Sequence, residues 1–120
     1  MPKTVVATSG APAAIGPYSQ AIVAGNTLYA SGQIAPDAGD VCAQTEKAFD
    51  SVEAIVAEAG FEMSDIVKTT VYLADMADFA KVNEIYARRM AKPYPARSCV
   101  AVAGLPKGAL VEVEILAVKC

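Results

Sequence analysis

Residues 41–73 read VCAQTEKAFDSVEAIVAEAGFEMSDIVKTTVYL and carry the clearest secondary-structure pattern of the chain. Apolar or small side chains recur at positions 41, 45, 48, 49, 52, 55, 56 and 59, which is helical spacing along one face. Asp40 is suited to cap the first turn of this helix, and Gly60 is suited to end it. The β-branched run Ile66–Leu73 follows and predicts a strand. The chain therefore combines helix and sheet.

A β-hairpin is predicted on the N-terminal side of this stretch. Gln20–Ala24 and Thr27–Ser31 flank the pair Gly25-Asn26. Glycine followed by asparagine can adopt the positive φ angles that a two-residue hairpin turn needs. A loop over Ala35–Gly39 would join this hairpin to the first helix, and one more strand is expected before the hairpin.

A second helix and two strands are predicted on the C-terminal side. Asp78 is expected to cap the helix, whose apolar stripe is Phe79, Val82, Ile85, Tyr86 and Met90. Pro93 and Pro95 end the helix and favour an extended chain after it. Strands are then expected over residues 97–103 and 110–118.

This order predicts an α+β two-layer sandwich, in which two helices cover one face of a mixed sheet. The other face of the sheet would need cover. Hydrophobic residues make up 54% and charged residues 19% of the 120 residues, and a lone domain of this size leaves much of its surface in water. We therefore expect a single domain over residues 1–120 that associates with copies of itself, although an Ala- and Val-rich core would by itself explain the apolar composition.

The net charge of −3 argues against general nucleic-acid binding, which needs a basic face. The densest basic cluster, Arg88, Arg89 and Lys92, lies where the second helix is expected to end. Cations there complement the helix dipole, so this interpretation is preferred over a nucleic-acid site. No nucleic-acid partner is expected.

Cysteine and histidine usage limits the chemistry further. The chain has three cysteines, at positions 42, 99 and 120, and no histidine. Their spacing matches neither a structural zinc site nor a disulfide framework, so no metal is expected. Without histidine, Ser-His-Asp and Cys-His catalysis and a histidine-pair ribonuclease mechanism are excluded. Acid–base work would fall to carboxylates, tyrosine, lysine or water.

The location is expected to be cytoplasmic. Reduced thiols suit the cytosol, and no charged region followed by an apolar run opens the chain. No stretch approaches membrane-spanning length, so no membrane partner is expected.

Arg97 is the first candidate for a site residue. Period-2 alternation puts Arg97 and Cys99 on one face of their strand, and Ser98, Val100 and Val102 on the other. The planar guanidinium matches a carboxylate or phosphate in bidentate geometry. A structural salt bridge is an equally good interpretation of this pattern alone.

The last strand carries two candidate carboxylates. Glu112 and Glu114 share one face with Leu110, Leu116 and Val118. They could simply face solvent, which is the commoner case. Alternatively, one is partly buried, has a raised pKa and takes a proton from water.

Two turn-like segments supply weaker candidates. Tyr18 lies in Gly16-Pro17-Tyr18-Ser19, a context that could present its phenol at a cleft, although a packed tyrosine is commoner. Ser31-Gly32 follows a predicted strand, and glycine permits close backbone approach to a ligand. A tight strand exit would explain the same pair. No phosphate-binding GxxxxGK[ST] or GxGxxG motif is present, and no cofactor is expected.

Together, several segments match a known pattern. In chain order they are Ile15-Gly16-Pro17-Tyr18-Ser19-Gln20, Ser31-Gly32-Gln33-Ile34, Asp65-Ile66-Val67-Lys68-Thr69-Thr70-Val71, Pro95-Ala96-Arg97-Ser98-Cys99-Val100 and Glu112-Val113-Glu114. They resemble the RidA (YjgF) family, also labelled endoribonuclease L-PSP, from about Pro12 to Lys119.

The resemblance implies a chorismate-mutase-like α+β subunit in a homotrimer, with sites at the subunit interfaces. It also implies hydrolysis of reactive enamines and imines, such as 2-aminoacrylate and 2-iminobutanoate, to 2-oxo acids and ammonia. A protonated imine is already electrophilic, so neither metal nor covalent nucleophile is required. Such a site needs only an anchor for the substrate carboxylate and a base near the water.

Carried over by residue, Arg97 would bind the substrate carboxylate and Glu112 would activate or orient the attacking water. Tyr18 would line the pocket, while Ser31, Gly32 and Cys99 would supply wall and backbone contacts. Asn83 matches a recurrent family position, for which a structural role is expected.

Two departures from the family concern loops. Residues 34–43 and 92–94 form shorter segments than typical members have, and this bears on substrate breadth. The competing functions are an endoribonuclease or translation inhibitor, and a trimer that binds a small carboxylate without catalysis. Acidic charge and missing histidine weigh against the ribonuclease.

Overall fold

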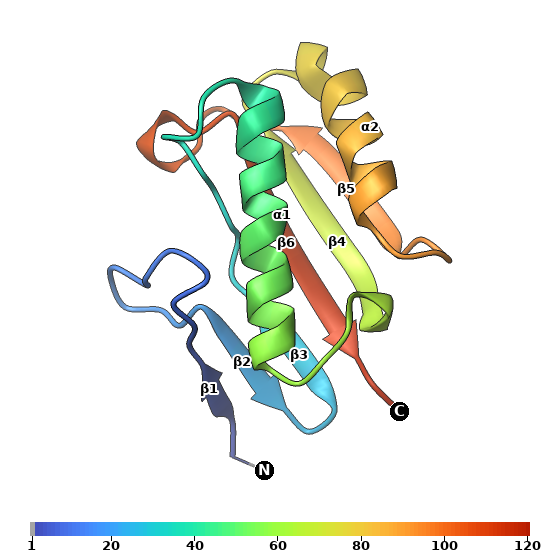
Figure 1. Ribbon diagram of the computed structural model, residues 1–120. Helices are drawn as coiled ribbons and strands as arrows, with labels where there is room; N and C mark the ends of the chain where they lie inside the picture. Colours follow the sequence, from blue (N-terminus) through green and yellow to red (C-terminus); the bar gives the residue numbers. More distant parts are fainter. Residues whose placement is uncertain (1) are drawn as a thin grey trace.

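A computed structural model describes residues 2–120, and its central feature is a mixed six-stranded sheet (Figure 1). The strand order is β1-β2-β3-β6-β4-β5. Strands β4 and β5 run parallel, and the other neighbouring pairs are antiparallel. The strands are β1 (Thr4–Val6), β2 (Ala21–Ala24), β3 (Thr27–Ala30), β4 (Ile66–Leu73), β5 (Ala96–Ala101) and β6 (Val111–Val118).

Both long helices cover the same face of this sheet, as Figure 1 shows. Helix α1 (Val41–Glu58) lies along the middle of the sheet and contacts β3 and β6, and α2 (Phe79–Arg89) lies beside it. Short 3-10 turns precede β4, α2 and β6, at Met63–Asp65, Met76–Asp78 and Pro106–Gly108. The predicted α+β two-layer sandwich is confirmed.

The core lies between the helices and alternate residues of the sheet. Phe49 and Ile55 of α1 are fully buried, as are Val111 and Val113 of β6. Burying one such side chain contributes about 1.5–3 kcal/mol. The predicted helical stripe at 41–59 faces this core, which explains its spacing.

Most local predictions are confirmed. The Asp40 side chain accepts a hydrogen bond from the Ala43 backbone N–H at 2.9 Å, and Gly60 ends α1 with φ 80°. The hairpin turn uses a positive φ at Gly25 alone, 62°, and not at Asn26. Strand β4 has the predicted bounds, and the other strand ends differ by one or two residues.

The prediction that Asp78 caps the second helix is wrong. Asp78 occupies the N-cap position of α2 but makes no side-chain capping bond there. A 3-10 turn precedes the helix, and Asp75 caps that turn by accepting from the Ala77 backbone N–H at 2.9 Å. The tight turn already bonds the backbone groups at this end, which leaves Asp78 without a capping role.

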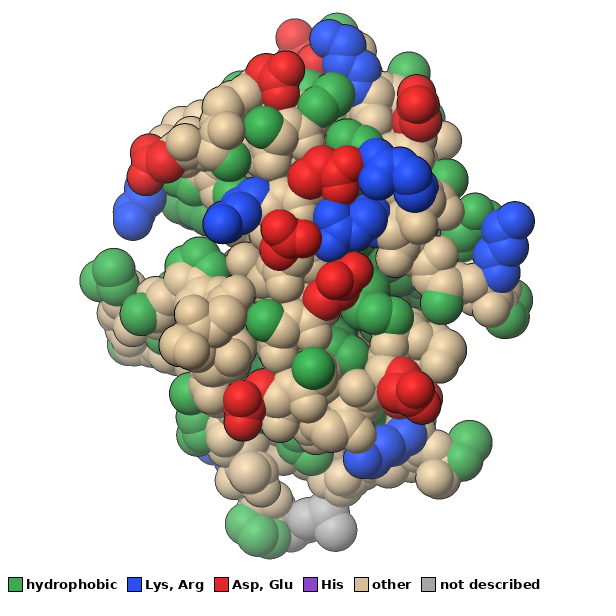
Figure 2. Space-filling model, viewed as in Figure 1, with side chains coloured by type: hydrophobic (Ala, Val, Ile, Leu, Met, Phe, Trp, Pro, Cys, Tyr) green, Lys and Arg blue, Asp and Glu red, His purple; other side chains and the backbone are tan. Residues whose placement is uncertain are grey.

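The basic cluster at the end of α2 is neutralised by α1. Arg89 contacts the carboxylates of Glu46, Asp50 and Glu53, and Arg88 also contacts Glu46. Acidic and basic side chains accordingly gather next to each other over the two helices in Figure 2. These pairs join the helices and leave no open basic patch at this point.

The second face of the sheet has no helix over it. Apolar side chains of its strands are exposed, among them Val5 at 61%, Tyr29 at 50% and Val100 at 45%. Within residues 2–120, no helix has both the length and the apolar character needed to span a bilayer. The exposed apolar side chains mark this sheet face as a surface suited to protein contact.

Candidate functional site

Arg97 lies on the edge strand β5 and points toward α2. Its guanidinium carbon is 4.7 Å from the centre of the Tyr86 ring and 5.5 Å from that of Phe79. Its Nη1 donates a hydrogen bond to Asn83 Oδ1 at 2.7 Å. Among residues 2–120, no carboxylate forms an ion pair with Arg97. An internal salt bridge therefore does not explain this arginine.

The environment of Arg97 suits an anionic ligand. The groups packed against the guanidinium are two aromatic rings and one neutral amide. Nε and Nη2 make no hydrogen bond within the described chain. A partly buried cation with free donors in a fork matches a carboxylate in bidentate geometry.

Cys99 lies two residues further along β5 on the same face as Arg97, as alternation predicts. Burial raises the pKa of the Cys99 thiol above its ordinary value, and the positive charge of Arg97 opposes this only in part. The thiol is therefore protonated near neutral pH, and its chemistry is that of a small pocket wall rather than a nucleophile.

The sequence did not predict that Phe79, Asn83 and Tyr86 contact Arg97. Sequence reasoning placed both rings in the apolar stripe of α2 and gave Asn83 a structural role. Their spacing of i, i+4 and i+7 puts the three side chains on one helix face. An asparagine between two aromatic residues on one helix face was the feature of the sequence that could have indicated a polar contact at this place.

Glu112 lies on β6 and points to the sheet face without helices. It is paired across the strands with Tyr72 of β4. Burial raises the pKa of the Glu112 carboxyl, and the negative charge of Glu114 raises it further. A carboxylate that holds a proton more tightly than usual is a stronger base, which is the property that the expected role of Glu112 needs.

Gly32 lies directly against Glu112. A Cβ at position 32 would overlap a carboxylate oxygen of Glu112 and would lie 2.6 Å from its carboxyl carbon. Glycine at position 32 therefore leaves room for the Glu112 side chain, which would have to move if a larger residue stood there.

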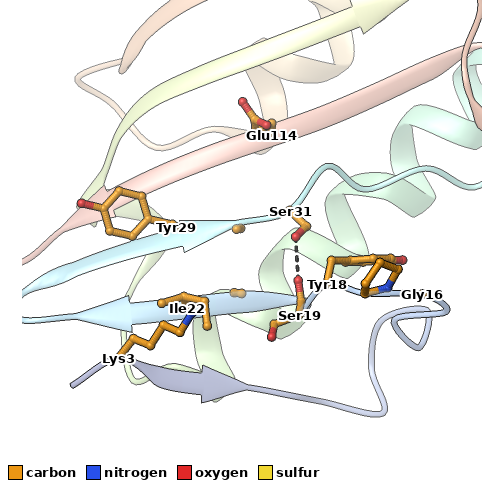
Figure 3. Close-up of a pocket in the computed structure, with 11 residues that line it drawn as sticks. Lys3, Gly16, Tyr18, Ser19, Ile22, Tyr29, Ser31 and Glu114 are labelled. Atoms are coloured by element: carbon orange, nitrogen blue, oxygen red, sulfur yellow. Dashed lines mark hydrogen bonds between the residues drawn. The ribbon is translucent and has the colours of Figure 1, made fainter.

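Tyr18 and Ser31 line a groove of about 720 Å³ on the helix-free face (Figure 3). The Ser31 hydroxyl donates to the Ser19 backbone carbonyl at 2.6 Å, and the Tyr18 side chain is exposed. Glu114, not Glu112, is the carboxylate that lines this groove. The other lining residues labelled in Figure 3 are Lys3, Gly16, Ser19, Ile22 and Tyr29.

The predicted site residues thus fall into two groups on opposite faces of the sheet. Thr69 of β4 pairs with both Arg97 and Ile115, and these three positions share the helix-covered face. Glu112 is three residues from Ile115 on β6, so alternation sends it to the other face. Within one chain, Arg97 and Glu112 cannot contact the same small molecule.

The two groups differ in their chemistry. The group on the helix-covered face consists of Arg97, Asn83 and Cys99. The group on the helix-free face consists of Tyr18, Ser31, Gly32 and Glu112. The first group can bind an anion, and the second can move a proton. Among residues 2–120, the Cys, Asp and Glu side chains form no cluster that could hold a metal ion.

Comparison with known proteins gives a consistent result. A family model described as Endoribonuclease L-PSP matches residues 8–119. A 2-iminobutanoate/2-iminopropanoate deaminase of Escherichia coli (strain K12) is 48% identical, and the match covers 99% of each chain. A RutC family protein of Pyrococcus horikoshii is 47% identical over 98% of each chain. The crystal structure of RidA from an Antarctic Psychrobacter is 43% identical, with a TM-score of 0.91 over 97% of this chain and 99% of that one.

Proposed function

Because this chain belongs to the endoribonuclease L-PSP (RidA) family, we propose that it is an imine deaminase. Its substrates are the imine and enamine forms of small 2-amino acids, such as 2-iminobutanoate and 2-aminoacrylate. Its products are the 2-oxo acid and ammonia. The observation that carries this proposal is Arg97, a cation with free donors and only neutral neighbours.

The proposal includes a homotrimer in which each site joins two chains. Arg97 of one chain and Glu112 of the next supply the anchor and the base, because one chain holds them on opposite faces. The exposed apolar side chains of the helix-free face support such association. Tyr18, Ser31 and Gly32 accompany Glu112, and Cys99 accompanies Arg97.

The reaction needs no group beyond these side chains and water. The protonated imine carries its own electrophilic carbon, and Arg97 fixes the molecule by its carboxylate. As the water oxygen bonds to that carbon, the C=N π electrons move to nitrogen and Glu112 accepts a proton from the water. Glu112 then returns the proton to nitrogen, and the C–N bond breaks. Ammonia leaves as the carbonyl forms, and the proton of the former hydroxyl group passes to bulk water.

The raised pKa of Glu112 supports its role in both proton transfers. A carboxyl with an ordinary pKa would be a weak base toward water and a poor store for the proton. Burial makes the charged form less favourable, so proton uptake from water is easier.

The test is a direct assay on 2-iminobutanoate generated in the cuvette by an amino-acid oxidase. The purified protein should accelerate formation of both 2-oxobutanoate and ammonia, and Arg97→Ala should not. Binding without catalysis, and ribonuclease activity, both predict no acceleration. An RNA substrate incubated with the same protein serves as the parallel control.

A further inference from the structure

We infer that Tyr86 is a positioning residue that aims Arg97 at the substrate carboxylate, an inference that rests on the function proposed above. Tyr86 lies on α2 and is 5% exposed. Its ring centre is 4.7 Å from the Arg97 guanidinium carbon, within the range of a cation–π contact.

The ring of Tyr86 is itself held from two sides. Its hydroxyl oxygen lies 2.7 Å from Thr69 Oγ1, and Thr69 is fully buried. Phe49 of α1 packs against the ring edge-to-face, with ring centres 5.9 Å apart and planes at 72°. A ring held at its hydroxyl and by a neighbouring ring is restricted in orientation, and this restricts the guanidinium that contacts it.

Thr69 closes the arrangement. It is the residue directly paired with Arg97 in the parallel β4–β5 ladder. The Arg97 backbone therefore lies beside Thr69, the Thr69 hydroxyl bonds Tyr86, and the Tyr86 ring contacts the Arg97 guanidinium. Through Thr69 and Tyr86, the backbone of Arg97 is thus connected to its own guanidinium by contacts within the core.

Such a link matters because arginine is long and flexible. A guanidinium that is free in solvent must give up many rotamers when it binds a ligand, and this weakens binding. Tyr86 restricts those rotamers before the ligand arrives. It does so without adding a negative charge, because burial raises the pKa of Tyr86 and keeps its phenol neutral.

A merely structural Tyr86 and a positioning Tyr86 differ in their kinetic effect. Loss of a core ring lowers stability, but a folded variant would keep its affinity for carboxylates. Loss of the ring that aims Arg97 weakens the hold on the carboxylate itself. That contact is made in the ground state and the transition state alike, so KM rises while kcat changes little.

The experiment compares Tyr86→Leu, Tyr86→Phe and Thr69→Val with Phe61→Leu, a buried aromatic residue that does not contact Arg97. For each variant, we would measure KM and kcat for the imine and, by calorimetry, the Kd of 2-oxobutanoate. Unfolding and assembly are checked for each variant as well.

Tyr86→Leu should raise KM and Kd about tenfold, with kcat within about twofold of the parent. Tyr86→Phe and Thr69→Val, which keep the ring contact but release its hydroxyl, should raise both about two- to threefold. Phe61→Leu should change neither.

A folded Tyr86→Leu protein with the parent KM and Kd overturns the inference. If that variant does not fold, parent values in both Tyr86→Phe and Thr69→Val overturn it instead. A parent that binds 2-oxobutanoate but does not hydrolyse the imine contradicts the proposed function, and the Kd series alone then decides the role of Tyr86. A parent that does not bind 2-oxobutanoate contradicts the carboxylate anchor and this inference with it.

Discussion

Arg97 and Glu112 project from opposite faces of one β-sheet, Arg97 toward α2 and Glu112 toward the face that no helix covers. The strand that carries Arg97 is at the edge of the sheet, and β4 separates it from the strand that carries Glu112. Side-chain motion cannot bring the two groups together across the packed sheet. A reaction that needs both must take them from different chains.

Mixing two inactive variants tests this arrangement. Arg97→Ala and Glu112→Gln should each be inactive as purified trimers. After the two are unfolded and refolded together in equal amounts, about a quarter of the sites should join an intact arginine to an intact glutamate, and that share of parent activity should return. Light scattering should report a trimer mass in every sample. A mixture with no activity would place both groups in one chain, against the geometry described above.

Gly32→Ala should abolish activity while the protein stays folded. The added methyl group would occupy the position of the Glu112 carboxylate, and a flexible glutamate side chain moves aside more easily than the backbone. Displacement of the base should cost on the order of 10²–10⁴-fold in kcat. The matched control is Gly104→Ala, where an added Cβ meets nothing within 4 Å. Near-parent kcat in Gly32→Ala would mean that the carboxylate acts from another position.

The pH dependence of the reaction should report Glu112. The base must be ionised, so kcat should rise with pH through a pKa above the ordinary 4.5. Burial is the larger cause of that raised value and Glu114 the smaller one, so Glu114→Gln should move this limb of the profile to lower pH without removing the shift. If this limb stays at the same pH in Glu114→Gln, the charge of Glu114 does not influence the pKa that controls the reaction.

The same raised pKa predicts how stability changes with pH. Folded protein binds the Glu112 proton more tightly than unfolded protein, so this contribution is present below about pH 4.5 and is lost as the pH rises through the folded-state pKa. Glu112→Gln cannot ionise and should become more stable relative to the parent over that rise. Urea unfolding at a series of pH values measures the difference, and parallel curves for the two proteins would contradict it.

Asn83→Asp should lower the proposed deaminase activity more than Asn83→Ala does. The Asn83 amide oxygen accepts from Arg97 at 2.7 Å, and a carboxylate at that place would pair with the guanidinium and compete with the substrate. Loss of one charged contact to the substrate is worth about 1.5–3 kcal/mol, or roughly 10–100-fold in kcat/KM. Saturation kinetics should show the loss mainly in KM. An aspartate variant at least as active as the alanine variant would show that Arg97 does not need a neutral partner.

Arg89→Ala should destabilise the protein more than Arg88→Ala. Arg89 is only 15% exposed in its side chain and contacts three carboxylates of α1, whereas Arg88 is 59% exposed and contacts one. We expect about 1–2 kcal/mol for Arg89 and about 0–0.5 kcal/mol for Arg88, from denaturant unfolding at low salt. The Arg89 effect should shrink at high salt. Equal losses would show that the burial and the additional carboxylate contacts of Arg89 add nothing to stability.

Local sequence patterns predicted those features that depend on neighbouring residues. The stripe in α1, its two ends and the hairpin at Gly25 follow from side-chain spacing and backbone preference. Alternation also placed Arg97 with Cys99 and Glu112 with Glu114 correctly on their own strands.

These patterns could not predict whether residues on two different strands lie on the same face of the sheet. That depends on the register of β4 with β5 and β6, which is set by pairing between distant segments. The contact of Tyr86 with Arg97 was not predicted for a related reason. An aromatic residue in an apolar stripe is interpreted as a core residue unless the strand that packs against it is known. The capping error at Asp78 arose because the 3-10 turn before α2 has no strong sequence mark.

The division of the site between chains has a genetic consequence in the proposed trimer. A chain that has lost only Arg97 or only Glu112 disables a single site beside it. A chain that has lost both disables two sites, one that uses its Arg97 and one that uses its Glu112. The other half of each of these sites belongs to a neighbouring chain, which can be a normal one. In a cell that makes both kinds of chain, the doubly altered allele would therefore be partly dominant over the normal one.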